Sequence, residues 1–491
     1  MVFSLPLPTP HRRLALPVPG HRYNMPVQPG SALYFVFLAG VFFLYWTCAP
    51  SRLARLSIIA AANLVFCAHY GLFYIVLIPA CATIEYLLGL GLMGSRAPSL
   101  RRTLVGISIL VNLTLLVGSR HMGWFLSHGW VPAHRASDWD WVFPLGLSFY
   151  TFQALTYTID LYRRDAEGTR SLLAHLSAVS FFPTLQAGPI TRVDNLVGQF
   201  AKRRFLSRAD GGRALFLIGT GVLKKALIAD FLAENLVNRV FDTPNLYSGA
   251  QALLAVYAYS LQLYFDFSGY TDIARGAGLL LGIDLPRNFD RPYLSANIAE
   301  FWRRWHISFS NWLRDYLYYS IPGKRTKIMP YLGLVITMLL GGLWHGVSWT
   351  FAIWGVLHGC ALAATRWWQA RRGRNRPQPT PLGRALAIFG TYQFVCFTWI
   401  FFRSASLQEA SQLLQRIGSL TLGLEGVSPL LGAVLALSAA LLFLPKQWYT
   451  RTMETFERCP FYVHAAALLA VAAAVQLLGG RGNVAFVYSR F

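Results

Sequence analysis

Apolar stretches long enough to cross a bilayer recur along the chain from Ser31 onward, and they constrain its fold more than any other feature. A helix of about 20 apolar residues spans the roughly 30 Å of hydrocarbon in a membrane. Because lipid offers no hydrogen-bond partner to an open backbone, each stretch is expected to be helical. The predicted helices cover residues 31–48, 53–68, 72–93, 103–119, 141–162, 214–234, 249–270, 328–344, 349–365, 385–402, 428–445 and 463–479. The sequence therefore predicts an all-α polytopic membrane protein with about a dozen transmembrane or re-entrant helices.

The charge distribution fits a membrane protein better than a nucleic-acid-binding protein. The chain has a formal net charge of +23, but only 13% of its 491 residues are charged and 55% are hydrophobic. Lys and Arg are concentrated in the short segments between apolar stretches, where they determine membrane topology. The six cysteines show neither a CxxC pair nor the spacing of metal ligands. We therefore expect neither a nucleic-acid partner nor a metal site.

Basic clusters also predict which helix ends face the cytoplasm, because Lys and Arg are enriched in cytoplasmic loops. The clusters assigned to the cytoplasm lie at 52–55, 96–102, 163–170, 324–327 and 371–376. The turn between the apolar stretches 328–344 and 349–365 then faces outward. This topology places His345 in the outer half of a helical hairpin.

The proline-rich residues 1–30 resemble neither a signal peptide nor a membrane span. They are expected to form a disordered N-terminal extension, and Met25 is an alternative initiator. Residues 31–491 are expected to form a single transmembrane domain.

His345 is the most unusual residue of the apolar part of the chain. It lies within TMLLGGLWHGVSWTFAIWGVLHG at 337–359. An ionisable side chain at membrane depth is costly and is usually retained for function. The alternative is an imidazole that bonds a helix-end carbonyl and packs between Trp344 and Trp349. His358, at the other end of the same segment, is interpreted as structural.

A second histidine, His306, lies in a predicted helix that begins at the capping pattern of Asn297 and Glu300. At helical periodicity, that helix would have one aromatic face and one basic face. Two interpretations stay open: a helix at the membrane surface with a snorkelling histidine, or a re-entrant helix buried among other helices.

Several sequence blocks carry a family resemblance. The two most specific are RNFDRPYLSANIAEFWRRWHISFSNWLRDYLY (287–318) and GGLWHGVSWTFAIWG (341–355), and the others are PLGLSFYTFQALTYTIDLYR, SFFPTLQAGPITR, YFDFSGYTDIARG and the final FVYSRF. Together they resemble the membrane-bound O-acyltransferase family, in particular bacterial alginate O-acetyltransferases and the teichoic-acid D-alanylation membrane protein. The resemblance implies helices around a central funnel or tunnel, with His345 as the catalytic histidine and His306 as a second functional position.

The implied reaction is acyl transfer, most simply of an acetyl group, from a cytoplasmic thioester such as acetyl-CoA to a hydroxyl. His345 is expected to be the general base, and His306 to orient the donor or donate to the oxyanion or leaving group. Trp305, Asn311 and Trp344 are candidates for lining the substrate passage. No tightly bound cofactor is expected.

The resemblance further implies a multi-pass protein of the bacterial cytoplasmic (inner) membrane. The expected acceptor is an extracytoplasmic polysaccharide, and a periplasmic acetyltransferase is the expected partner that takes over the acyl group. The same chemistry on teichoic acid, a lipid or a protein is one alternative. A transporter or flippase that uses intramembrane carboxylates is the other, with Glu85, Asp160, Asp230 and Asp266 as its candidates. In the YFDFSGYTDIARG block, ion pairing of the carboxylates is favoured over a role in holding the donor.

Overall fold

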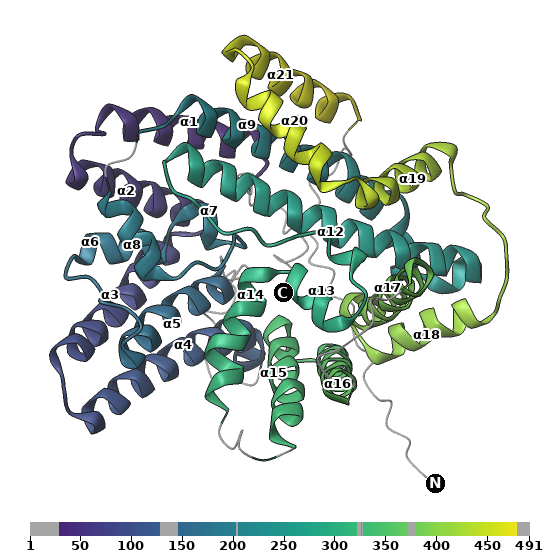
Figure 1. Ribbon diagram of the computed structural model, residues 1–491, viewed down its shortest axis with the longest axis horizontal. Helices are drawn as coiled ribbons and strands as arrows, with labels where there is room; N and C mark the ends of the chain where they lie inside the picture. The colour runs from purple at the N-terminus through teal and green to yellow at the C-terminus, as the bar shows by residue number, and fades with distance from the viewer. Residues whose placement is uncertain are drawn as a thin grey trace, which may run out of the picture.

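A computed structural model describes residues 29–127, 146–202, 205–321, 326, 328–371 and 380–478, and these residues are helical with no strand among them. The long helix α12 (Gly249–Leu280) lies at the centre, between the N-terminal helices on one side and the C-terminal helices on the other (Figure 1). The extension at 1–30 lies almost wholly outside the described residues. The final FVYSRF and most of the basic residues at 324–327 and 371–376 also lie outside them.

The helices before α12 form two groups. The first comprises α1 (Ala32–Thr47), α2 (Arg52–Tyr70), α3 (Leu72–Gly94), α4 (Pro98–Ser127), α5 (Leu147–Arg163), α6 (Leu172–Val179), α7 (Phe182–Leu185) and α8 (Val193–Ala201). The second comprises α9 (Arg208–Leu223), the π-helical turns η2 (Lys224–Ala229) and η3 (Ala233–Val237), α10 (Asp230–Leu232) between those turns, α11 (Asn238–Asp242) and η4 (Pro244–Leu246).

The helices after α12 complete the fold. They are η5 (Pro292–Leu294), α13 (Ile298–Arg304), α14 (Ile307–Trp312), η6 (Leu313–Leu317), η7 (Tyr318–Ser320), α15 (Met329–His345), α16 (Trp349–Arg371), α17 (Pro381–Arg403), α18 (Leu407–Gly418), α19 (Pro429–Phe443), α20 (Lys446–Arg458) and α21 (Phe461–Leu478).

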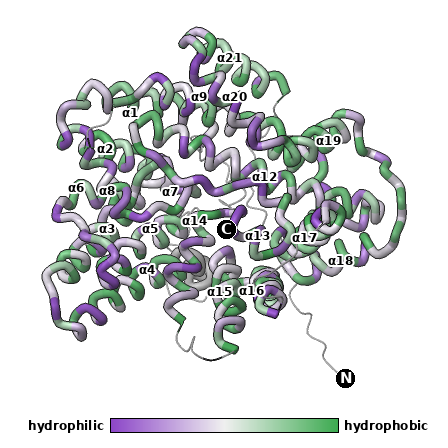
Figure 2. The backbone as a smooth tube through the Cα atoms, in the orientation of Figure 1, coloured by the Kyte–Doolittle hydropathy of each residue, from purple (hydrophilic) through white to green (hydrophobic). Residues whose placement is uncertain are grey.

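The predicted apolar stretches correspond to helices, except that 214–234 is divided among α9, η2, α10 and η3. Hydrophobic residues occur along all the long helices (Figure 2). Within the described residues, however, five helices are long and apolar enough to cross a membrane: α2, α3, α4, α17 and α21. The pair α19–α20, bent by 93°, would be a sixth. The prediction of about a dozen spans is therefore confirmed only in its coarser form, a helical membrane protein with several spans.

The difference in span number comes partly from helix length, because the apolar helices α1 and α15 have only 16 and 17 residues. The interior of the protein also contains apolar helices that other helices cover. Helix α12 is buried along most of its length by other helices, so protein surrounds it where lipid would surround a simple span. The segment that follows Arg208 is interrupted by two π-helical turns. Such irregular backbone is tolerated at membrane depth when neighbouring protein covers it.

The predicted helix around His306 is interrupted, which corrects the sequence interpretation. Asn297 caps α13 as expected, because its side chain accepts a hydrogen bond from the Glu300 N–H at 2.9 Å. The helix ends at Arg304, and His306 adopts a left-handed conformation with φ 42° and ψ 57° before α14 begins. His306 is 1% exposed, so a surface helix with a snorkelling histidine is wrong, and the segment is buried among other helices.

The hairpin of α15 and α16 places His345. The two helices pack so closely that a Cβ atom on Gly342 would overlap the backbone carbonyl of Phe351, and one on Gly355 would overlap that of Met338. Small residues of this kind allow the backbones of membrane helices to approach each other. The close packing fixes the turn that follows His345, the last residue of α15.

Candidate active site

His345 is buried, with 3% of its surface exposed, at the C-terminal end of α15. Five aromatic side chains from four helices surround its imidazole. The distances between ring centroids are 4.6 Å to Trp344, 4.9 Å to Phe402, 5.4 Å to Trp354, 5.9 Å to Phe309 and 6.0 Å to Phe351. The histidine is therefore held in a rigid aromatic environment at a point where the chain leaves the helix.

His306 lies in a second aromatic environment, at the break between α13 and α14. Its ring is 4.6 Å from that of Phe267 on α12, 4.9 Å from that of Phe309 and 6.1 Å from that of Phe149 on α5. Phe309 thus contacts both histidines. The structure brings the two predicted histidines to the same part of the molecule, where both rings lie near the ring of Phe309.

The three candidates for the substrate passage occupy different places. Trp344 stacks on Phe309 at 4.9 Å and packs on Phe152 at 4.8 Å, so it lies next to both histidine environments. Trp305 is buried in the core against Phe289, Phe301 and Trp399. Asn311 lines a cavity beside α14.

A cavity of about 640 Å³ opens beside the start of α14. Its lining begins immediately after His306, with Ile307 and Ser308, and continues through Asn311 and Trp312. Other segments contribute three basic side chains, Arg192, Lys202 and Arg287, and two acidic ones, Asp284 and Asp315. Polar side chains, Asn195, Gln199, Thr156 and Tyr316 among them, also belong to the lining. The cavity could accommodate an anionic group close to the histidine-bearing break.

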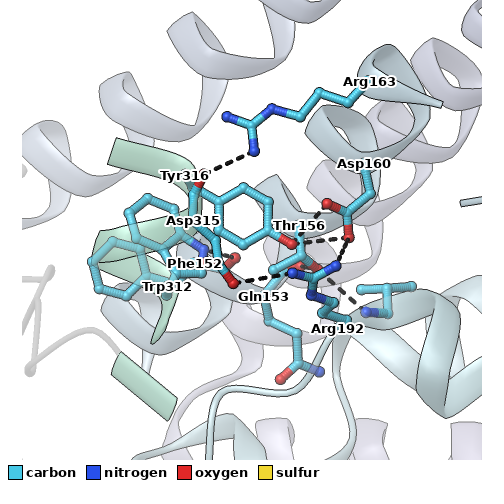
Figure 3. Close-up of polar contacts among 10 residues, drawn as sticks. Phe152, Gln153, Thr156, Asp160, Arg163, Arg192, Trp312, Asp315 and Tyr316 are labelled. Atoms are coloured by element: carbon cyan, nitrogen blue, oxygen red, sulfur yellow. Dashed lines mark hydrogen bonds and ion pairs between the residues drawn. The ribbon is translucent and has the colours of Figure 1, made fainter. Parts of the chain in front are cut away.

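An arginine and tyrosine cluster forms part of this lining (Figure 3). The Tyr316 hydroxyl lies 2.8 and 2.9 Å from the two carboxylate oxygens of Asp160 and donates a hydrogen bond to that carboxylate. Arg192 lies 3.7 Å from Asp160 and 3.2 Å from Asp315. The guanidinium carbons of Arg192 and Arg163 both lie 5.5 Å from the centroid of the Tyr316 ring.

These contacts also stabilise the positive charge of Arg192, which lies in the segment before α8 and, like any arginine, is protonated. Burial alone would lower the pKa of its guanidinium, but Tyr316, Asp160 and Asp315 together raise that pKa above its usual value. Arg192 therefore remains a fixed positive charge, with its side chain 48% exposed at the cavity. Sequence reasoning assigned no role to Arg192 or Tyr316, although both lie in or next to the blocks that carry the family resemblance.

The cavity also connects to His345 through packed aromatic rings. Trp312 lines the cavity and donates a hydrogen bond from its indole N–H to the Phe152 carbonyl at 3.0 Å. The Phe152 ring lies 4.2 Å from that of Trp312 and 4.8 Å from that of Trp344, the neighbour of His345. A rigid wall of side chains therefore runs from the cavity to the buried histidine.

His358 has a different environment, which supports the structural interpretation. Its Nδ1 accepts a hydrogen bond from the Trp302 indole N–H at 3.2 Å, so its Nε2 carries the proton and donates to the Thr398 hydroxyl at 2.9 Å. Both ring nitrogens therefore bind helices of the core together.

The carboxylates considered for a transporter are engaged in local interactions. Glu85 accepts hydrogen bonds from Ser108 at 2.8 Å and from Asn112 at 2.6 Å. Asp230 and Asp266 each lie 2.7 Å from the Lys225 amine. The Asp272–Arg275 pair of the YFDFSGYTDIARG block is present at 3.9 Å, and Lys224 lies 2.5 Å from Asp272. The expected ion pairing in this block is therefore observed.

Comparison with known proteins identifies the family. Residues 133–406, more than half of the chain, match the model of the membrane-bound O-acyltransferase family. The chain belongs to this family. It is 38% identical to the probable alginate O-acetylase AlgI of Azotobacter vinelandii over 399 residues, which cover 78% of this chain and 76% of that protein. The predicted resemblance is therefore confirmed, and the chain is an acyltransferase of the membrane-bound O-acyltransferase family.

Two further relatives show the range of the family. The chain is 33% identical to the peptidoglycan O-acetyltransferase of Helicobacter pylori, with 75% of this chain and 73% of that protein covered. It is 31% identical to the teichoic acid D-alanyltransferase of Bacillus subtilis, with 57% and 72% covered. The names of the three relatives refer to O-acetylation of alginate, O-acetylation of peptidoglycan and D-alanylation of teichoic acid.

Proposed function

We propose that this protein is an O-acetyltransferase of the bacterial cytoplasmic membrane that moves an acetyl group from a cytoplasmic thioester to an extracytoplasmic acceptor. The observation that carries the proposal is the joint contact of His306 and His345 with Phe309, beside a basic cavity. Acyl transfer needs a base for the acceptor hydroxyl and a donor to the tetrahedral oxyanion. Two buried imidazoles on one aromatic ring are suited to divide those roles.

In the proposed reaction, His345 removes the proton from the acceptor hydroxyl while the hydroxyl oxygen attacks the acyl carbonyl carbon. The new C–O bond forms, the C–S bond breaks and the departing thiolate takes up a proton. His306 orients the donor or donates to the oxyanion or the leaving sulfur. Histidine suits such proton transfers near neutral pH.

The basic cavity is proposed as the entry of the donor. Arg192, Lys202 and Arg287 belong to its lining, and guanidinium groups recognise phosphate oxygens through charge-assisted hydrogen bonds. A phosphate-bearing thioester such as acetyl-CoA fits this chemistry. A cytoplasmic entry is supported by Arg163, which belongs to the basic cluster at 163–170 predicted to face the cytoplasm and donates a hydrogen bond to the backbone carbonyl of Asp315 in the cavity lining. The thioester is a substrate, and no resident cofactor takes part in the proposed reaction.

The acceptor is proposed to be a polysaccharide hydroxyl on the other side of the membrane, reached directly or through a periplasmic acetyltransferase that takes over the acyl group. The relatives named for alginate and peptidoglycan O-acetylation support this choice over teichoic acid, a lipid or a protein. A transporter that uses carboxylates is less well supported, because Glu85, Asp230 and Asp266 are engaged with neighbouring side chains.

Transfer of labelled acetyl from acetyl-CoA to extracted polysaccharide, in membranes that contain matched amounts of protein, tests the proposal. The wild type should transfer label, and His345→Ala should not. His464→Ala is the matched control, because His464 is also buried but bonds the Phe456 carbonyl at the distant α20–α21 corner. Full transfer by His345→Ala, together with loss of transfer in Asp266→Asn, would instead favour the transporter.

A further inference from the structure

Asn288 lies beside the break between α13 and α14, and only 1% of its surface is exposed. Its backbone carbonyl accepts a hydrogen bond from the Ile307 N–H at 2.9 Å, and its side-chain Oδ1 accepts one from the Ser308 N–H at 3.1 Å. A single buried residue therefore binds the first two backbone donors of α14.

These two hydrogen bonds replace the bonds that a continuous helix would have. In such a helix, the N–H groups of residues 307 and 308 would bond the carbonyls of Arg303 and Arg304. The Arg304 carbonyl instead accepts a hydrogen bond from the Asp290 N–H at 3.0 Å. The segment 288–290 thus satisfies backbone groups on both sides of the break, which would otherwise be buried and unbonded.

The conformation of His306 depends on this arrangement. Its φ of 42° lies in the left-handed region, which is strained for a residue with a Cβ atom. Such a backbone persists only where the surroundings determine it. With the next two N–H groups held by Asn288, the His306 ring is directed at Phe267 and Phe309.

Asn288 is itself held from two directions. The neighbouring Phe289 packs against Phe267 and Trp305, both at 5.1 Å, and the Asn288 amide donates a weak hydrogen bond to the Thr271 hydroxyl at 3.5 Å. Residues on α12 and α13 therefore hold the segment that determines the break.

We propose that Asn288 is a positioning residue for acyl transfer. By binding the Ile307 and Ser308 N–H groups, it fixes the backbone of His306 and hence the direction of the imidazole toward Phe267 and Phe309. The inference rests on the proposed function, because it acts through the role of His306 in acyl transfer.

Steady-state acetyl transfer by the full-length protein in membranes, expressed per folded protein, tests this role. Asn288→Ala removes the Oδ1 acceptor and should lower kcat about tenfold or more, while the KM for acetyl-CoA changes less than about threefold. Asn288→Asp retains an oxygen acceptor for Ser308 and should keep at least about a third of the wild-type kcat. Thr271→Val is the matched control, because it removes the other contact of the Asn288 side chain and leaves the two caps, and its kcat should remain near the wild-type value.

Three results would overturn the inference. The first is an unchanged kcat in Asn288→Ala, and the second is an equal loss in Thr271→Val and Asn288→Ala. The third is a kcat for Asn288→Asp below about a tenth of the wild-type value. This result overturns the inference even if Asn288→Ala does not fold. Absence of transfer by the wild type would instead contradict the proposed function itself, so the two failures are distinguishable.

Discussion

His345 and His358 lie on the same helical hairpin and are both buried, yet their surroundings differ. Both nitrogens of His358 take part in hydrogen bonds that join α13, α16 and α17, through Trp302 and Thr398. His345 ends its helix, and Phe309 connects it to His306 and to the segment that lines the cavity. The comparison teaches that burial and residue type alone do not identify a functional histidine. The position of the ring relative to the cavity and to the break in the chain separates the two.

The largest effect should follow from removal of the His345 ring. His345→Ala should lower kcat by about 10²–10⁴-fold, the usual contribution of a general base. The variant should keep its thermal unfolding temperature close to that of the wild type, which fluorescence-detected unfolding in detergent can measure. If His345→Ala kept a kcat within a few-fold of the wild-type value, His345 would not be a general base and would be structural, like His358.

His306 should come next, and two substitutions separate its ring from its backbone. His306→Gly removes the imidazole and tolerates the left-handed backbone, whereas His306→Ala removes the imidazole and retains the strain. Both should lower kcat about 10²-fold, the cost of losing one donor to an oxyanion. The glycine variant should be the more stable of the two. Wild-type turnover by His306→Gly would show that only the break, and not the ring, is needed.

Arg192 should affect donor binding more than chemistry. Arg192→Ala should raise the KM for acetyl-CoA about tenfold with little change in kcat, because it removes a charge at the proposed donor entry. Arg213→Ala is the matched control, since Arg213 is similarly exposed, pairs with Glu457 at 2.8 Å and does not belong to the lining of this cavity. Equal KM values for the two variants would argue against the donor entry.

The smallest effect on activity should come from His358. His358→Ala leaves the buried Trp302 N–H and the Thr398 hydroxyl without their histidine partner, so we expect a loss of about 1–3 kcal/mol in stability. Its kcat per folded protein should stay within about threefold of wild type, because the ring takes no part in the proposed proton transfer. A larger loss of kcat at unchanged stability would mean that His358, too, acts in the reaction.

The sequence predicted the helices well because apolar length is a local property. The start of α13 was predictable because it, too, depends on a local signal: the Asn297 cap is formed by residues three positions apart. The break at His306 could not be predicted in this way, because aromatic and basic residues keep their helical spacing through it. The N–H groups that follow the break bond Asn288, which lies 18 residues before His306 in sequence, and such a contact leaves no local signal.

The site was predictable only in part. The resemblance singled out His345 and His306, and the fold places both against Phe309. Arg192 and Tyr316 escaped notice because their cluster joins α5, the segment before α8 and η6, which are far apart in the chain. About a dozen spans stay a prediction, because within the described residues five or six helices are long and apolar enough to cross a membrane and the apolar helices α1 and α15 are shorter.

The most direct test of proton removal by His345 compares two acceptors of different acidity. The rates of acetyl transfer by the wild type and by His345→Ala would be measured with a monosaccharide acceptor and with its fluorinated analogue, whose free hydroxyl is more acidic. For each acceptor, the wild-type rate is divided by the rate of His345→Ala. General-base catalysis predicts a smaller quotient for the more acidic hydroxyl, because that acceptor depends less on a base. An unchanged quotient would contradict it, and His345 would then be a residue that shapes the site without taking the proton.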